Sequence, residues 1–437
     1  MARLYLSFLG TNPYVECCYE IEGSVSPPVR FVQEQTVLHC GGKWTEADRV
    51  VIFATSLAKK KNWIDNGHND GQPGLASRLE KLGLKAGIKM VEIPDGHNEA
   101  QLWEIFSIVL AEIEQGDEVV FDITHAFRSI PMLAIVILNY AKVVRKIRLR
   151  GIYYGAFEAL GSPKAVKENY PEPAGRVAPV LDLSSLDRLL DWSFAVDKLL
   201  KAGDATALRA LARSSVYSLL RESKGTDPAA VAIRRLGDAL EQFTRTMNTC
   251  RCREIGPVVD KLKAALSDCG RADIINPLKP LIDDIGKEVA PFQTDLVYNG
   301  IHAARWCARH HLVQQGLTIL NETLVTWCLI NAGEAEQNTD IKTRKIASQA
   351  LDIVTRKRPE SDWKGDAGDN KELTHRLVRV IKDMPGIEKA SSTLRELRND
   401  INHGGMSLKS FSADDFGEKL NQMLDLVESL LLQPCSN

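Results

Sequence analysis

The 437-residue chain lacks several features that would assign it to a class at once. Its formal charge at pH 7 is only −2, so no strong overall field draws a nucleic acid to it, and a polyanion would need a local basic patch. No apolar run reaches the ~20 residues that a membrane-spanning helix requires. The longest run, residues 131–144, is predicted to be a buried helix. We therefore expect a soluble, folded protein without a membrane partner.

The nine cysteines follow no pattern that is typical of disulfides or of zinc. Cys250 and Cys252, taken with Cys269 and His302, have irregular gaps instead of the spacing of structural zinc sites, so no metal is expected. The chain also begins without the basic region, apolar run and cleavage site of a secretory signal. These observations predict a reducing, cytoplasmic location.

The first 160 residues alternate between β-rich and helical patterns, which predicts crossover units and a mostly parallel sheet in an α/β domain. An apolar stripe from Leu102 to Ile113 predicts a helix that covers the sheet. Residues 14–32 are predicted to form a hairpin excursion after the first strand. The expected strands are residues 3–10, 49–55, 88–94, 117–124 and 147–155.

The pattern changes at residues 158–179, where glycine and proline accumulate and periodicity lapses. This composition predicts an interdomain connection, and we place the boundary at residue 182. Almost every later segment has helical periodicity, so the second half is predicted to be all-α. No internal repeat is visible, so the sequence does not predict a solenoid. The predicted domains are residues 1–182 and 183–437.

Open parallel sheets bind ligands beyond the carboxyl ends of their strands, so the loops there are candidate sites. A glycine permits close backbone approach, and hydroxyls and amides suit phosphate or ribose groups. Each loop taken alone is also typical of an ordinary strand-to-helix junction. The loop after the fourth strand contains more charged and polar side chains than a helix start needs. One capping side chain suffices for a helix, so the others require another explanation. The candidate residues are Gly10, Thr11 and Asn12, then Thr55 and Ser56, then Asp122, Thr124, His125, Arg128 and Ser129.

The stretches RLYLSFLGTNPY and FDITHAFRSIP, in this order, resemble the CARF domain, the Rossmann-like domain of CRISPR-associated proteins that sense cyclic oligoadenylates in type III systems. The resemblance covers roughly residues 1–160. It implies a homodimer in which two CARF domains share one cyclic oligoadenylate, with cyclic tetra-adenylate as the expected allosteric activator and no other cofactor. It also implies that the candidate residues of all three loops contact this ligand.

Near the other end, helical geometry gives the stretch LRNDINHGG an apolar face and an adjacent polar arc. Arginine can bind a phosphate through two hydrogen bonds, and histidine can transfer a proton near neutral pH. Because Arg398 and His403 stand about 140° apart around the helix, one copy can hardly surround a scissile phosphate, whereas two facing copies can. The polar arc consists of Arg398, Asn399, Asn402 and His403.

The form Arg-Asn-x-x-x-His behind a CARF-like domain resembles the HEPN ribonuclease domain. That resemblance implies a composite site at a dimer interface and metal-independent cleavage of single-stranded RNA, with 2′-hydroxyl attack that leaves a cyclic phosphate. It implies that Arg398 stabilises the phosphorane charge, that His403 transfers a proton and that Asn399 orients either His403 or the substrate. The spacing alone is equally typical of a helix C-terminus whose histidine interacts with the last carbonyls.

Two other functions remain open at this point. The chain could be a non-catalytic regulator that binds a cyclic nucleotide and uses its helical half for dimerisation or for a partner. It could also be a ring nuclease, in which Thr124, His125 or Arg128 helps to cleave the cyclic oligoadenylate itself. Glu322, in LTILNETLVTW, is interpreted as an ordinary surface acid, with a polar group near the site as the alternative.

Overall fold

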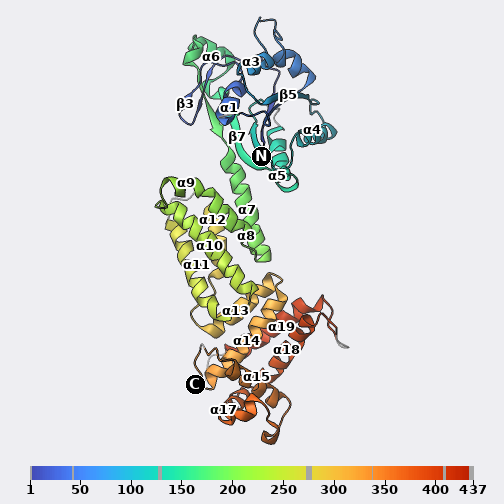
Figure 1. Cartoon of the computed structure of the whole chain (residues 1–437), viewed down its shortest axis with the longest axis vertical. Coiled ribbons are helices and arrows are strands. Elements are labelled where there is room, and N and C mark those ends of the chain that lie inside the picture. The colour runs from blue at the N-terminus through green and yellow to red at the C-terminus, as the bar shows by residue number, and fades with distance from the viewer. Residues whose placement is uncertain are drawn as a thin grey trace. The chain divides into compact units, whose positions relative to one another are not determined.

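The chain forms two compact units, Met1–Arg188 and Leu189–Asn437, in a computed structural model (Figure 1). The division falls inside helix α7 (Ser184–Ala202), a few residues beyond the expected boundary at residue 182. Each unit has its own hydrophobic core, and each is described separately. The structure describes residues 2–41, 44–125, 130–271, 278–336, 338–406 and 410–432.

The N-terminal unit is built on an eight-stranded sheet of order β3-β2-β8-β7-β6-β1-β4-β5. Strand β1 pairs in parallel with β4 and β6, and β5 and β7 extend the parallel part on either side. Only β2 with β3 and β7 with β8 pair antiparallel among the described strands. The predicted mostly parallel sheet is therefore confirmed. The strands are β1 (Arg3–Leu9), β2 (Cys18–Ile21), β3 (Ser24–Val25), β4 (Arg49–Ala54), β5 (Gly87–Glu92), β6 (Glu118–Asp122), β7 (Arg148–Gly155) and β8 (Val177–Asp182).

Helices cover both faces of the sheet, which explains why its central strands are apolar almost throughout. In β1, Leu4, Leu6 and Phe8 belong to the core on one face, whereas Tyr5 and Leu9 belong to the core on the other. Helices α4 and α5 pack into the first core, and α1 and α3 pack into the second. These helices are α1 (Val32–Gly41), α3 (Leu75–Lys81), α4 (Glu99–Ala111) and α5 (Ile130–Val144).

Residues 158–179 are not the loose interdomain connection that composition predicted. They contain helix α6 (Pro163–Asn169) and the start of β8. Strand β8 pairs antiparallel with β7 and in parallel with β2, so this segment completes the sheet. Pro179 lies within β8, and a proline normally argues against a strand. The prediction was wrong because the proline broke the β pattern of a short strand.

Residues 131–144 form a helix, α5, but only one of its faces is buried. Ile137 is completely buried against the sheet. On the opposite face Met132, Val136 and Val143 leave 74%, 54% and 66% of their surface exposed, and Tyr140 is also exposed. The expectation of a buried helix is thus correct for one face alone. None of the helices in the described part of the chain combines the length and the apolarity that a bilayer crossing needs.

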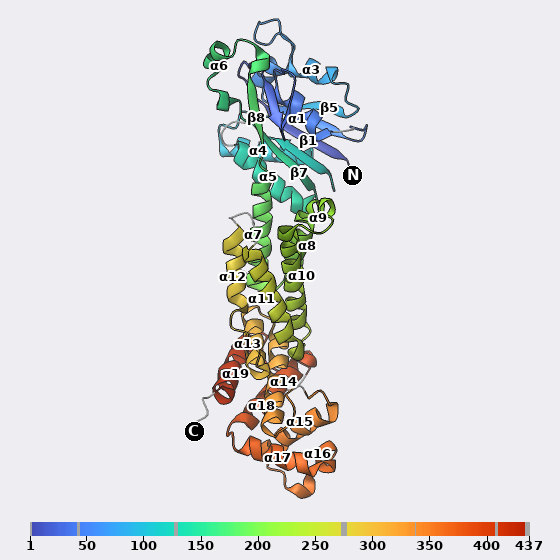
Figure 2. The ribbon, with the colours of Figure 1, turned by 90° about the vertical axis from the view of Figure 1, so that its left-hand side faces the viewer.

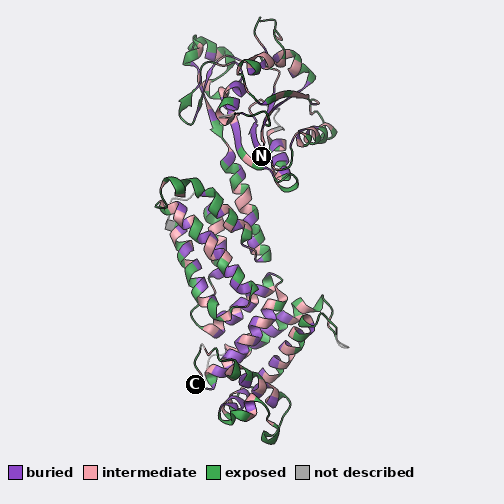
Figure 3. Cartoon of the chain, in the orientation of Figure 1, coloured by how far each residue is buried: buried purple, intermediate pink, exposed green. Residues whose placement is uncertain are grey.

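Every regular element in the described part of the C-terminal unit is a helix, as predicted. Helices α10 and α11 run side by side (Figure 2), and α14 packs on α13, α18 and α19. Figure 3 shows buried residues along the facing sides of these helices, where Trp306 is the largest fully buried side chain. Beyond α7, the helices are α8 (Thr206–Ser215), α9 (Tyr217–Glu222), α10 (Pro228–Asn248), α11 (Ile255–Arg271), α12 (Lys279–Val289), α13 (Leu296–Arg309), α14 (Val313–Asn331), α15 (Ile341–Thr355), α16 (Asp366–Asp369), α17 (Lys371–Lys382), α18 (Ile387–Asn402) and α19 (Asp415–Leu431).

Candidate functional site

The strand order places a topological switch point at β1. Strands β4 and β5 follow on one side of β1, and the chain then crosses to β6 and β7 on the other side. Ligands of open α/β sheets bind at such a point, beyond the carboxyl ends of the strands. A pocket of about 530 Å³ lies there. The loops after β1, β6 and β7 contribute to it. Its lining includes Asn12, Pro13, Tyr14, Arg30, Thr124, His125, Gly155, Phe157, Glu158 and Ser162.

The loop after β1 is held by two residues that the sequence did not reveal. The buried Asn62 side chain donates to the carbonyls of Gly10 and Asn12, each at 2.9 Å. The N–H of Gly10 donates to the Tyr14 hydroxyl at 3.0 Å. A Cβ at position 10 would lie 2.5 Å from that hydroxyl oxygen, so a larger residue there would displace the Tyr14 hydroxyl and disturb this hydrogen bond. The loop is fixed in a shape that puts Asn12 at the pocket, whereas the predicted contacts Gly10 and Thr11 are not among the residues that line it.

The loop after β4 does not reach the pocket. Thr55 is buried, and its Oγ1 accepts the N–H of Ala58 at 3.2 Å, so it caps the short helix α2 (Ser56–Ala58). Ser56 is exposed and does not line the pocket. Thr55 and Ser56 are therefore placed outside the pocket that the other two loops form.

Asp122 supports the loop after β6 from beneath. It is completely buried, and its Oδ2 accepts hydrogen bonds from Tyr5 (2.9 Å) and Thr36 (2.7 Å). Its Oδ1 accepts from the Thr124 hydroxyl (2.6 Å) and N–H (3.0 Å). Burial raises the pKa of Asp122 and outweighs these hydrogen bonds, which lower it. The predicted direct contact with a ligand does not fit this position, because the carboxylate has no exposed surface.

Thr124 and His125 stand at the pocket itself. The Thr124 hydroxyl accepts the N–H of Gly155 at 2.8 Å, which ties the loop to the end of β7. The imidazole of His125 packs on the Tyr14 ring, with centroids 4.1 Å apart. Its Nε2 is buried and has no hydrogen-bond partner among the described residues. Arg128 and Ser129, which were also predicted to contact the ligand, lie outside the described residues.

Burial lowers the pKa of His125 to about 3, so its imidazole is neutral at physiological pH. A neutral imidazole can donate one hydrogen bond and accept another. Leaving a buried polar nitrogen unpaired is costly, on the order of 1–3 kcal/mol. A ligand group in the pocket could supply the missing partner of Nε2.

Arg30, Phe157 and Ser162 also line the pocket but carried no recognisable sequence signal. Arg30 is buried and forms an ion pair with Asp70 at 2.9 Å. Ser162 lies in the segment that composition had predicted to be an interdomain connection, and Phe157 directly precedes that segment. Their contribution could not be foreseen because it depends on the return of the chain to the sheet through β8.

In the helical unit, α18 presents the predicted polar arc at its surface. Leu394 and Leu397 are completely buried, and Ile401 packs against the same core. Three residues of this arc, Asn399, Asn402 and His403, are exposed. The fourth, Arg398, leaves 28% of its side chain exposed.

The end of α18 is fixed by its backbone. The N–H of His403 donates to the carbonyl of Asn399 at 2.9 Å. Gly404 and Gly405 follow with φ angles of 63° and 70°, a left-handed conformation that ends helices and that glycine adopts readily. The predicted helix stop is confirmed, and it leaves the imidazole of His403 at an exposed helix terminus.

Glu322, on α14, lies between two arginines. Arg344 Nη2 is 2.7 Å from Glu322 Oε2 and also donates to the hydroxyl of Thr326 at 3.1 Å. Arg398 Nη1 lies 4.0 Å from Glu322 Oε1, and Arg398 Nε is buried without a partner in the described part of the chain. Of the two interpretations of Glu322, the structure favours a polar group near the site, because the carboxylate faces the guanidinium of the motif.

Two further residues define the surroundings of the motif. Gln314, also on α14, donates to the side-chain oxygen of Asn402 at 3.1 Å. Burial, and next the charge of Glu322, raise the pKa of Cys252 to about 12, so its thiol stays protonated.

No group of three or more histidine, cysteine or acidic side chains that could hold a metal ion occurs within the described ranges.

The N-terminal unit has a Rossmann-like fold with a pocket beyond the carboxyl ends of its parallel strands. Residues 4–158 match the CARF domain of the CRISPR system endoribonuclease Csx1. The chain is also similar to the CRISPR-associated protein MJ1674 of Methanocaldococcus jannaschii, with 26% identity over 365 residues. That alignment covers 80% of this chain and 48% of the relative, so the chain spans about half the length of that protein. The two matches support a CRISPR-associated protein with an N-terminal CARF domain.

The aligned 365 residues exceed the length of the N-terminal unit, Met1–Arg188. The similarity to the relative therefore continues into the helical unit that carries Arg398 and His403.

Proposed function

We propose that the chain is a homodimeric, cyclic-oligoadenylate-activated endoribonuclease of type III CRISPR defence that cleaves single-stranded RNA without a metal. One observation carries this proposal. A domain that matches the CARF domain of Csx1 precedes an Arg-Asn-x-x-x-His motif at the exposed end of an anchored helix. Arg398, Asn399 and His403 are the proposed catalytic residues, and the pocket of the N-terminal unit is the proposed activator site.

The chemistry of the pocket supports a nucleotide ligand. Aromatic rings of Tyr14 and Phe157 can pack against adenine, while Asn12, Thr124 and His125 offer hydrogen bonds to its edges, to ribose or to phosphate. A pocket of about 530 Å³ has the size that a drug-sized ligand needs. This suits part of a cyclic tetra-adenylate ring, as expected if two copies share one ring.

The outer face of α5 supports a dimer. Met132, Val136, Tyr140 and Val143 are exposed on it, and Trp103 of α4 is exposed as well. A run of exposed apolar side chains of this kind is typical of a protein–protein interface. Because α5 follows directly after the β6 loop, pairing through α5 would bring the His125 loops of two copies toward the two-fold axis.

At the helical motif, the proposed reaction is a transesterification. A His403 imidazole removes the proton from a ribose 2′-hydroxyl, whose oxygen attacks the adjacent phosphorus while the bond to the 5′-oxygen breaks. The leaving oxygen takes a proton from the imidazolium of the second copy, which gives a 2′,3′-cyclic phosphate and a 5′-hydroxyl. Arg398 stabilises the charge of the pentavalent phosphorus through hydrogen bonds. Asn399 orients His403 or the substrate.

A ring nuclease is a second candidate, because Thr124 and His125 line the pocket where a cyclic oligoadenylate would bind. General-base catalysis is most effective when the pKa lies near the working pH. With a pKa of about 3, His125 is a weak base. Ligand binding is therefore better supported for His125 than cleavage. Incubation with cyclic tetra-adenylate, followed by analysis for linear products, separates the two.

The main test is cleavage of a labelled single-stranded RNA in EDTA, with and without cyclic tetra-adenylate or cyclic hexa-adenylate. The activator should stimulate cleavage, and His403→Ala and Arg398→Ala should abolish it. His375→Ala is the matched control, because His375 is exposed and pairs with Glu360 away from the motif. No stimulation, or full activity in His403→Ala, would contradict the proposal. Unchanged cyclic-nucleotide binding with no cleavage would favour the non-catalytic regulator.

A further inference from the structure

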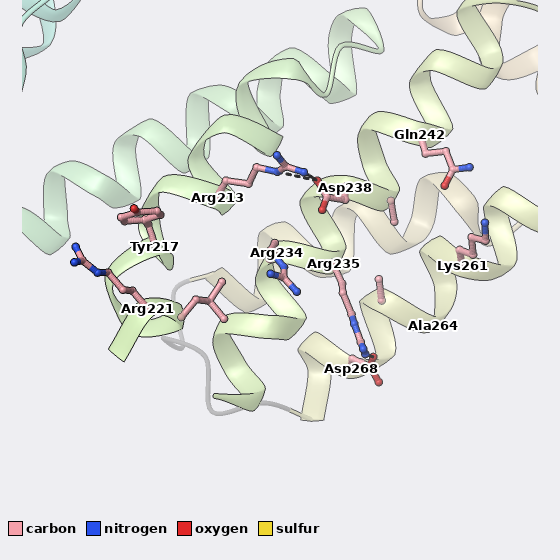
Figure 4. A pocket seen from close by; sticks show the side chains of 13 residues that line it. Arg213, Tyr217, Arg221, Arg234, Arg235, Asp238, Gln242, Lys261, Ala264 and Asp268 are labelled. Carbon is pink, nitrogen blue, oxygen red and sulfur yellow. Dashed lines mark hydrogen bonds and ion pairs between the residues drawn. The ribbon is translucent and has the colours of Figure 1, made fainter. Parts of the chain in front are cut away.

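An open groove of about 890 Å³ lies on the helical unit, away from the motif of α18 (Figure 4). It is formed by α8, α9, α10 and α11, and it is larger than the pocket of the N-terminal unit. Its lining includes Ala239, Ala264 and Ala265, whose side chains are small. The cations that line it are Arg213, Arg221, Arg234, Arg235 and Lys261.

The groove has an excess of positive charge that the whole chain lacks. Five cations line it against two carboxylates, Asp238 and Asp268, while the formal charge of the chain is −2. Figure 4 shows Arg213 reaching Asp238, at 2.8 Å, and Arg235 lies 3.7 Å from Asp268. Asp238 also pairs with an arginine outside the groove, so it compensates Arg213 only in part.

Three of the five cations are uncompensated. Arg221, Arg234 and Lys261 are exposed and form no ion pair within the described part of the chain. Arginine guanidinium groups bind phosphate oxygens through two parallel hydrogen bonds, and four of the five cations are arginines. Such an arrangement favours a polyanion that carries phosphate groups over an acidic peptide.

A tyrosine and an amide accompany these cations. Tyr217 leaves 68% of its surface exposed at the edge of the groove, and an exposed aromatic ring can stack on an unpaired base. Gln242 lies on α10 toward the other end (Figure 4). Unpaired bases are available in single strands but not in a duplex, so the aromatic ring favours a single-stranded ligand.

The groove continues past α10 into a second hollow of about 360 Å³, which shares Arg213, Asp238 and Gln242 with it. The second hollow adds three arginines and two carboxylates, and its Glu241 pairs with Arg209 and Arg245. From Arg234 to Arg245 the path along α10 measures about 16 Å at the rise of an α-helix. An open path of this length suits an extended chain better than a compact small molecule.

We propose that this groove binds single-stranded RNA by its sugar–phosphate backbone, with Tyr217 stacked on a base. The inference rests on the proposed ribonuclease function, for which it supplies a substrate-holding surface separate from the catalytic motif. Arg221 and Arg234 contribute uncompensated charges from α9 and α10, and Lys261 adds a third from α11.

The test measures the binding of a short labelled single-stranded RNA to full-length His403→Ala protein by fluorescence anisotropy, between about 50 and 200 mM salt. Arg221→Gln/Arg234→Gln in this background should weaken binding about tenfold and reduce the slope of log Kd against log salt by about 1.4. Tyr217→Ala should weaken binding at least about fivefold and leave the slope unchanged. A duplex of the same sequence should bind more weakly than the single strand.

The matched control is Arg379→Gln/Lys382→Gln, which removes two exposed cations of α17 that have no ion pair among the described residues. It should keep the affinity and the salt slope. Unchanged binding in Arg221→Gln/Arg234→Gln, or an equal loss in the control, overturns the inference. The inference is also overturned if the groove binds polyglutamate through these arginines but does not bind RNA.

These measurements separate the inference from the proposed function. Because the binding is measured in His403→Ala protein, it does not depend on cleavage. If the wild-type protein cleaves no RNA but the groove variants still lose RNA affinity, the groove stands and the ribonuclease proposal fails. If activated cleavage occurs and the groove variants bind RNA as well as the wild type, the ribonuclease proposal stands and the groove fails.

Discussion

The Oε1 atom of Glu322 lies 4.0 Å from Nη1 of Arg398, across the gap between α14 and α18. Glu322 is itself held by Arg344 at 2.7 Å. The carboxylate therefore has a fixed direction, and it limits the orientations that the partly exposed guanidinium of Arg398 can adopt. A guanidinium that must meet a phosphate through two hydrogen bonds depends on such orientation.

Replacing this carboxylate should impair catalysis without unfolding the protein. In Glu322→Gln, we expect activated RNA cleavage to fall roughly tenfold to hundredfold, because small misplacements of a catalytic group are costly. The loss should appear in kcat, with a small change of melting temperature. Glu360→Gln is the control, since Glu360 pairs with Lys371 and His375 instead. Equal activity of the two variants would contradict a positioning role for Glu322.

Asn62 holds the loop after β1 by two hydrogen bonds, so we expect its replacement to weaken the binding of cyclic tetra-adenylate. Asn62→Ala removes two partly buried hydrogen bonds to the carbonyls of Gly10 and Asn12. We expect the free energy of unfolding to drop by about 2 kcal/mol and the affinity for cyclic tetra-adenylate, measured by calorimetry, to fall at least tenfold. Asn331→Ala, which removes an exposed bond to a helix carbonyl, should change neither. Wild-type affinity in Asn62→Ala would show that the loop shape does not matter for binding.

The exposed face of α5 predicts how the protein dimerises. A charge placed at the centre of this face, in Val136→Glu/Val143→Glu, should be desolvated in a dimer and should prevent association. Light scattering should then report the monomer mass, and activation by cyclic oligoadenylate should be lost. Val25→Glu on β3, at another exposed apolar residue, should remain dimeric. A dimer mass for the α5 variant would place the interface elsewhere.

The burial of His125 predicts a dependence of stability on pH. Its pKa is lowered from 6.5 to about 3 in the folded protein. Between these values the unfolded chain binds a proton that the folded chain does not, so stability is fully present above pH 6.5 and falls as the pH drops toward 3. In His125→Gln the loss of unfolding free energy between pH 7 and pH 5 should be smaller by at most about 2 kcal/mol. Chemical unfolding measures this difference.

The control for that experiment is Asn331→Ala, because this side chain is exposed and does not titrate. It should show the same loss between pH 7 and pH 5 as the wild type. If His125→Gln also matched the wild type, His125 would not be the neutral, buried group that its surroundings indicate.

The parallel strands could be predicted because burial on both faces of a sheet produces continuous apolar runs such as that of β1. The stretches FDITHAF and LRNDINHGG were likewise visible, since each contains its chemistry in consecutive residues. Strand β8 was missed because Pro179 interrupts its pattern and its pairing partner, β2, lies far away in the chain.

The residues missed at both candidate sites share one property. Asn62 and Glu322 act on residues that are distant in sequence, so nothing local distinguishes them from a surface amide and a surface acid. Asp122 shows the converse, since its place in a motif predicted a ligand contact, whereas its hydrogen bonds to Tyr5 and Thr36 show that it supports the loop. Burial and partners decide such roles, and both arise only on folding.

Tyr14 joins the two loops of the N-terminal pocket, because its hydroxyl accepts the Gly10 N–H and its ring packs on His125. The two loops therefore behave as one mechanical unit, and a ligand that displaces His125 must also disturb the turn at Gly10. Ligand preference cannot be altered one loop at a time. An altered preference for ring size would require paired substitutions that preserve the fit between Gly10, Tyr14 and His125.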